Sequence, residues 1–173
     1  MVVSLRKILS EPMGIHALRA KVPDYCKVVL YSSLLNDERH RGMIFGNKKC
    51  LIVLYEGKID GKIQAHYVCL SRRHNRVEYF SSMGFNASHE LTILGLKGKK
   101  PAFERLLGKA YEVNRKRLQS DKYNVNDCAY WVLARVLLYK MSLREFQSFY
   151  LSKPAIRSPD DLLAASMWLV ANS

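Results

Sequence analysis

The sequence predicts a single α+β domain in which a small, mostly antiparallel β-sheet packs against helices. Two observations carry this prediction. Between residues 49 and 81, three segments rich in β-branched and aromatic residues follow one another with short polar turns, the pattern of an antiparallel meander. After residue 84, apolar residues recur at helical spacing. The 173 residues, 49% of them apolar, suffice for one core, so residues 1–173 are expected to form one domain.

The elements before the meander are predicted to be short. Residues 4–22 are expected to be helical in two pieces, separated near Pro12 and Gly14 because both residue types interrupt helices. Cys26–Ser33 has the β-branched and aromatic content of a strand. Residues 36–47 are polar and charged, so a loop with room for one helical turn is expected.

Three strands make up the predicted meander. Lys49–Glu56 is almost wholly apolar, as a central strand is, and Lys62–Ser71 and Arg76–Ser81 follow it. We expect turns at Gly57–Gly61 and Arg72–Asn75.

Helix-start signals mark the second half of the chain. From Ala129 onward, apolar residues recur at i, i+3, i+4, i+7 and i+8, which predicts a helix that begins near Cys128, after N-cap candidates within 124–127. Capping boxes at 142–145 and 158–161 predict two more helices. The second of these leads into an apolar C-terminal segment that we interpret as a packing element.

A formal net charge of +13 favours polyanionic partners such as DNA, RNA or an acidic protein surface. No zinc-finger or RNP motif accompanies the basic residues, so contact with nucleic acid is expected to be sequence-independent and salt-sensitive. A solvated basic surface without a partner is the alternative. The basic clusters lie at 39–41, 48–49, 72–76, 97–100 and 115–117.

The four cysteines show no CxxC spacing, and no export signal is evident, so we expect reduced thiols in a cytosolic or nuclear compartment. No apolar run reaches the length of a membrane span, and no membrane partner is expected. No metal site is expected either. His66 and Cys69 should point to opposite faces of their strand, and nothing else has zinc-ligand spacing.

Cys128 is the strongest candidate for chemistry. In the first turn of a helix, the helix dipole and unpaired backbone N–H groups stabilise a thiolate. A thiol nucleophile needs a nearby base, and His66 differs from the other histidines because it lies within a predicted strand, on the same face as Val68 and Leu70. A buried core cysteine and a structural histidine are the alternatives.

Four motifs follow one another along the chain: His66-Tyr67-Val68, then the strand end Val77–Gly84 (VEYFSSMG), then Gln119, then the helix start Asp127–Val132 (DCAYWV). In this order and spacing the chain resembles the adenain-type and SUMO-protease superfamily of cysteine proteases. The resemblance covers roughly residues 15–150. It is closest to the maturation proteases of adenoviruses, virophages and Polinton-type elements.

The resemblance implies a permuted papain-like fold and a thiol-protease mechanism. Cys128 would be the nucleophile, His66 the general base and then acid, and Gln119 would donate its side-chain amide to the oxyanion, assisted by the Cys128 backbone N–H.

Three positions depart from the family pattern. Tyr67 replaces a tryptophan, Ala129 replaces the glycine after the cysteine, and Ser81 stands where the family has its acidic third member. Ser81 could orient the imidazole with a neutral hydrogen bond, or the site could work as a Cys–His dyad. Glu78 is expected on the opposite face of the strand as a solvated charge.

The resemblance further implies a viral endopeptidase that processes capsid or scaffold precursors during virion maturation, in the virion and in the host cytoplasm or nucleus. We expect a monomer that needs no cofactor for its chemistry, with DNA as a candidate activating polyanion. Two alternatives stay open. One is a weak or inactive homologue that acts as a basic DNA-binding or virion structural protein, which Ser81 and Ala129 favour. The other is a ubiquitin-like isopeptidase.

Overall fold

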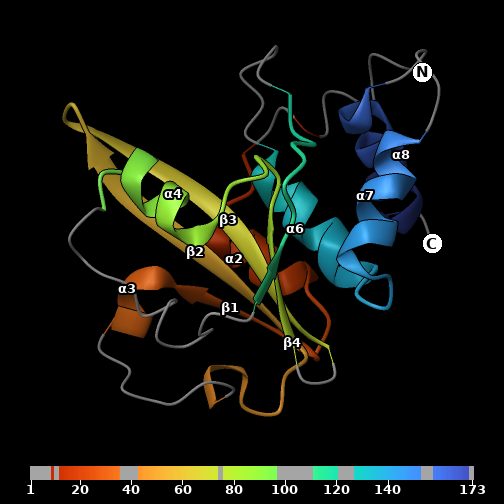
Figure 1. Ribbon diagram of the computed structural model, residues 1–173, viewed down its shortest axis with the longest axis horizontal. Helices are drawn as coiled ribbons and strands as arrows, with labels where there is room; N and C mark the ends of the chain where they lie inside the picture. The colour runs from red at the N-terminus through yellow and green to blue at the C-terminus, as the bar shows by residue number, and fades with distance from the viewer. Residues whose placement is uncertain are drawn as a thin grey trace.

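Five strands form one mixed sheet in the order β1-β2-β3-β4-β5 (Figure 1). The computed structural model describes residues 9, 12–35, 43–73, 76–96, 111–120, 127–152 and 158–171. Strands β2, β3 and β4 are antiparallel to one another, whereas β1 runs parallel to β2 and β5 parallel to β4. The strands are β1 (Cys26–Leu30), β2 (Cys50–Ile59), β3 (Lys62–Arg73), β4 (Arg76–Ser81) and β5 (Tyr111–Val113).

The α+β class is confirmed, but the sheet is mixed rather than mostly antiparallel. The meander itself forms as predicted, and β4 has the predicted bounds. The two edge strands make the parallel pairs because long connections, not hairpins, join them to their neighbours. The short strand β5 was not predicted.

The first hairpin turn is tighter than predicted. Strand β2 continues to Ile59, and Asp60 and Gly61 alone make the turn, with φ of 48° and 79°. Positive φ at both positions is typical of a two-residue hairpin loop. Gly57, predicted in the turn, instead lies in the strand. Strand β3 likewise continues to Arg73, into the second predicted turn.

The first strand is shorter than predicted because a helix takes its last residues. Tyr31–Leu35 forms α3, and its Tyr31 and Leu34 are buried on one side of the sheet. The Tyr31 ring packs against that of Tyr55, with centroids 4.8 Å apart. Residues at i and i+3 share a face of a helix but not of a strand, so tertiary packing favours the helix here.

Helices cover both faces of the sheet, and two apolar clusters result. In Figure 1, α4 lies in front of the sheet and α2 behind it. One cluster contains residues of α2 (Ile15–Lys21), α6 (Cys128–Leu137), α7 (Leu143–Leu151) and α8 (Pro159–Ala171). The other contains residues of α3, the 3-10 helix η1 (Met43–Phe45) and α4 (Ala87–Ile93).

The predicted helix starts are confirmed for the last three helices. Ser142 and Glu145 form the capping box of α7, and Ser158 and Asp161 bond to each other's backbone at the start of α8. Helix α6 begins at Cys128. The buried face of α8 fits a packing element.

Some predicted features fall outside the described residues. These are the first helical piece apart from Leu9, most of the loop at 36–47, the basic clusters at 39–41 and 97–100, and the N-cap candidates at 124–126. Within the described part of the chain, no helix is long and apolar enough to cross a bilayer. All four cysteines are free thiols and buried.

Candidate functional site

The candidate site lies where β4 ends beside the longer strand β3. Ser81, the last residue of β4, pairs with Val68, so β3 extends past β4 at Tyr67 and His66. The N-terminus of α6 occupies this position and brings Cys128 to the edge of β3. The Cys128 sulfur accepts hydrogen bonds from the backbone N–H groups of Tyr67 and Ala129.

Cys128 and His66 form a hydrogen-bonded pair, and both side chains are about nine-tenths buried. Burial alone raises the pKa of the Cys128 thiol, but the hydrogen bond and charge of His66 outweigh burial and lower that pKa below its ordinary value of 9.0. Burial lowers the pKa of His66, but hydrogen bonds to Cys128 and Glu90 outweigh it and raise the pKa to about 10. The pair therefore favours thiolate and imidazolium at neutral pH.

A carboxylate that sequence analysis did not consider stands behind the imidazole. His66 Nε2 lies 3.4 Å from Glu90 Oε1 and 3.3 Å from the Ser81 hydroxyl oxygen. The Ser81 hydroxyl donates a hydrogen bond to the same Glu90 oxygen. Because Nε2 faces Ser81 and Glu90, Nδ1 is the ring nitrogen left for the thiol. Ser81 thus lies beside the imidazole, as expected, but the negative charge comes from α4.

The sequence carries a signal for Glu90. Ala87, Leu91 and Leu94 recur at helical spacing with Glu90 between them, and all four are buried. A lone acidic residue on the apolar face of a helix needs a buried partner, because a buried charge without one is costly. The pattern could therefore have indicated Glu90, though not that its partner is His66.

Glu78 does lie on the opposite face from Ser81, but the prediction that it is solvated is wrong. Its side chain is buried, with a residue exposure of 4%, and forms an ion pair with Arg135 of α6. The backbone N–H of Leu143 also donates to Glu78. Helices α6 and α7 cover this face, so the carboxylate joins them to β4 and is not available to His66.

Asn114 is a second residue that the sequence did not reveal. Its side-chain oxygen accepts from the Ser81 backbone N–H at 2.8 Å, and its amide donates to the Ser81 carbonyl at 2.6 Å. The two bonds fix the backbone of Ser81 just beyond β5. Asn114 thereby holds the residue that bridges His66 and Glu90.

Gln119 lies on the segment that crosses the end of β4. Its backbone N–H donates to the Ser82 carbonyl, and its side-chain carbonyl accepts from the Ser82 hydroxyl at 2.6 Å. The next residue, Ser120, donates its backbone N–H to Asp160, which also accepts from Trp131 of α6. These contacts tie the Gln119 segment to the turn after β4 on one side and to α6 and α8 on the other.

Asp127, the residue before Cys128, occupies the N-cap position of α6 without a capping bond from its side chain. Its buried carboxyl group interacts with that of Asp160 instead. Burial and the charge of Asp160 raise the pKa of Asp127 to about 8. The pair holds a proton at neutral pH, which removes the repulsion between two buried carboxylates.

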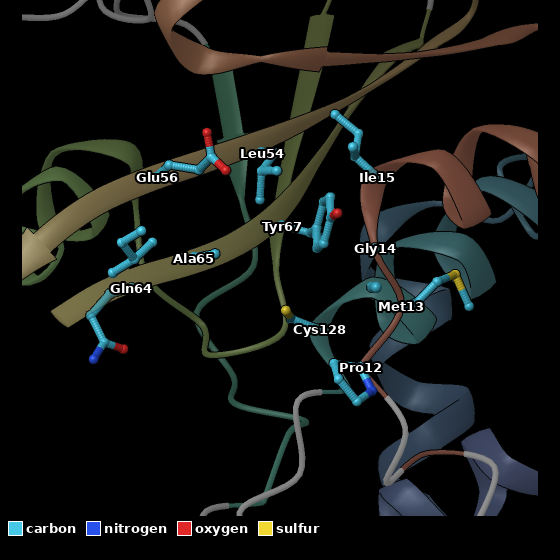
Figure 2. A pocket seen from close by; sticks show the side chains of 12 residues that line it. Pro12, Met13, Gly14, Ile15, Leu54, Glu56, Gln64, Ala65, Tyr67 and Cys128 are labelled. Carbon is cyan, nitrogen blue, oxygen red and sulfur yellow. The ribbon is translucent and has the colours of Figure 1, made fainter.

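Cys128 opens into a cleft of about 550 Å³ (Figure 2). The Cys128 sulfur points away from α6 toward β3, which carries Tyr67 and Ala65. One wall of the cleft is the β2–β3 hairpin and the other is the segment before α2. The lining residues are Pro12, Met13, Gly14, Ile15, Leu54, Glu56, Ile63, Gln64, Ala65, Tyr67, Cys128 and Ala129.

The other histidines in the described part of the chain contact neither Cys128 nor His66. His16 and His89 are exposed on α2 and α4. No group of three or more potential metal ligands comes together among the described residues. Comparisons with known protein families, curated proteins and solved structures found no match to this chain. The family resemblance therefore stays a prediction.

Proposed function

We propose that the chain is a cysteine endopeptidase of the adenain-like type that processes capsid or scaffold precursors during virus maturation. The observation that carries the proposal is the hydrogen-bonded Cys128–His66 pair with a lowered thiol pKa at the edge of a cleft. Thiol-protease chemistry needs a thiolate, a proton carrier and room for a peptide. The viral substrate class rests on the sequence resemblance alone.

Each catalytic step follows from this pair. The Cys128 thiolate attacks the peptide carbonyl carbon, and the oxyanion accepts hydrogen bonds from the Cys128 backbone N–H and the Gln119 amide. His66 gives its proton to the leaving amine as the C–N bond breaks, which leaves a thioester. His66 then takes a proton from water, the hydroxide adds to the thioester, and the C–S bond breaks to return the thiolate.

Glu90 supplies the acidic group that the family has at the position of Ser81 and that this chain lacks there. Its carboxylate stabilises the imidazolium and, with Ser81, sets the ring orientation. The serine at position 81 therefore does not weigh against an active enzyme. Glu90 acts through His66 and is a positioning residue.

Coexpression with the candidate capsid precursor tests the proposal. We expect discrete N- or C-terminal trimming of the precursor with the wild type and none with Cys128→Ala or His66→Ala, read by intact mass. Cys26→Ala is the matched control, because burial raises the pKa of the Cys26 thiol to about 12 and the residue lies on β1. It should trim like the wild type.

Trimming by Cys128→Ala would remove Cys128 from the mechanism. Absence of trimming, together with a Cys128 thiol no more reactive than that of Cys26, would favour the inactive homologue.

A further inference from the structure

Apart from the Cys128 thiolate, the cleft has one charged side chain among its described lining residues, Glu56. The other ten are apolar or neutral and polar. A single carboxylate is notable in a chain with 28 basic and 15 acidic residues. Glu56 is exposed, so solvent and a bound molecule can both reach it. Among the described residues, none forms an ion pair with it.

The strand register fixes where this carboxylate lies relative to the nucleophile. Glu56 pairs with Ala65, and Leu54, two residues earlier on β2, pairs with Tyr67. Glu56 and Tyr67 are therefore diagonal neighbours, which lie about 7–8 Å apart on one face of an antiparallel pair. Tyr67 donates its backbone N–H to the Cys128 sulfur.

The charges of Glu56 and Cys128 both affect the pKa of the Tyr67 side chain. Burial, the largest cause, and the charges of Cys128 and Glu56 together raise the pKa of Tyr67 to about 12. Figure 2 shows Glu56, Leu54 and Tyr67 around one space, with Cys128 at its lower end. The carboxylate thus belongs to the same cleft as the thiol.

We propose that Glu56 is a specificity-determining residue that binds a lysine or arginine side chain of the peptide lying in this cleft. The inference rests on the proposed peptidase function. An extended peptide advances about 3.3 Å per residue, so a basic side chain within about three residues of the scissile bond would reach Glu56. Binding would cover the carboxylate and exclude water from it, which strengthens a charge-assisted hydrogen bond. Apolar walls at Leu54 and Ile15 would hold the aliphatic part of that side chain.

A peptide library derived from a whole proteome tests this, with cleavage sites identified by mass spectrometry. The wild type should cleave preferentially at sites that carry lysine or arginine at one fixed position near the scissile bond. Glu56→Gln should lower kcat/KM for such a peptide about tenfold relative to its alanine analogue. Glu56→Lys should shift the preference at that position toward aspartate or glutamate.

Glu112→Gln is the matched control, because Glu112 is exposed on β5 and does not line the cleft. It should keep the wild-type preference. Cleavage by the wild type without a basic preference, or a preference unchanged in Glu56→Lys, would overturn the role of Glu56 and leave the peptidase assignment in place. If the wild type cleaves no peptide and Cys128 labels no faster with iodoacetamide than Cys26, the peptidase proposal and this one both fall.

Discussion

Glu90 changes how the Cys128–His66 pair should behave, because it places a second anion beside the imidazole. The hydrogen bond and charge of Glu90 both raise the pKa of His66. A more basic imidazole holds its proton more tightly and so stabilises the neighbouring thiolate. One ring nitrogen, Nδ1, therefore faces the thiol, and the other, Nε2, faces Ser81 and Glu90.

Alkylation by iodoacetamide should report this arrangement. Thiolate is lost as the pH falls through the lowered pKa of Cys128, and its imidazolium partner persists up to pH about 10. We therefore expect Cys128 to label faster than Cys26 at pH 6, because the pKa of Cys26 is raised to about 12. Glu90→Gln should lower the pKa of His66 and raise that of Cys128. At pH values below the thiol pKa, labelling should slow about tenfold for each unit by which that pKa rises.

Peptide mapping by mass spectrometry measures the labelling of each cysteine separately. Glu112→Gln serves as the control, since Glu112 is an exposed carboxylate on β5. A Glu90→Gln variant that stays folded and labels like the wild type across pH 5–8 would show that the carboxylate does not support the ion pair.

The β2–β3 hairpin forms a wall of the cleft, and its position depends on a close crossing with the end of α4. A Cβ atom added to Gly57 would lie 1.8 Å from the backbone oxygen of Leu94. No side chain can enter that space without separating the hairpin from α4. Helix α4 also carries Glu90, so one contact joins the wall of the cleft to the carboxylate behind His66.

Gly57→Ala should lower the free energy of unfolding by about 1–3 kcal/mol or more, because overpacked sites relax only by moving backbone. Chemical denaturation followed by circular dichroism measures the change. Gly14→Ala is the control: nothing lies within 4 Å of its added Cβ, and its effect should stay below about 1 kcal/mol. Equal stability of the two variants would show that the end of α4 does not pack against the hairpin closely enough to exclude a side chain at position 57.

Six basic residues of the described chain lie at the end of the sheet away from Cys128. We define this basic end as Lys48, Lys49, Arg72, Arg73, Arg76 and Lys140. Strand register places Arg73 opposite Arg76, and Arg73 reaches the Lys140 carbonyl. Arg73 lies six positions along β3 from Tyr67, about 20 Å at 3.3 Å per residue. A bound polyanion could therefore occupy the basic end without covering the cleft.

We expect DNA to bind the basic end without sequence preference. The double variant Lys49→Glu, Arg72→Glu should bind a DNA duplex more weakly. The slope of log affinity against log salt should become shallower by about 1–2, because fewer counterions are released from the DNA when phosphate contacts are lost. Fluorescence anisotropy at several salt concentrations measures both. The control double variant Lys58→Glu, Lys62→Glu, at the β2–β3 hairpin, changes the net charge by the same amount. Its salt dependence should stay steeper than that of the Lys49→Glu, Arg72→Glu variant.

Similar losses in the two double variants would indicate general attraction by net charge rather than a site. Peptidase activity that responds neither to added DNA nor to salt would remove DNA as an activator.

Local sequence was enough to predict the meander, the starts of α6, α7 and α8, and the alternation of side chains on β3. Each depends on residues close together in the chain: strand periodicity, capping boxes, and an apolar face at helical spacing. Predictions failed where contacts between residues distant in the sequence determine the secondary structure or the burial of a residue. Tyr31 joins a helix because Tyr55 and the sheet cover it, and Glu78 is buried because Arg135 lies opposite it.

The sequence by itself determined that Cys128 would begin a helix and that His66 would lie within a strand. Only the tertiary structure decided that the end of α6 reaches the edge of β3 beyond β4, and that Glu90 stands behind the imidazole. The physical reason is that side-chain periodicity is a property of neighbouring residues. The pairing of a thiol, an imidazole and a carboxylate depends on how three separate elements pack, and on the burial that strengthens their charges.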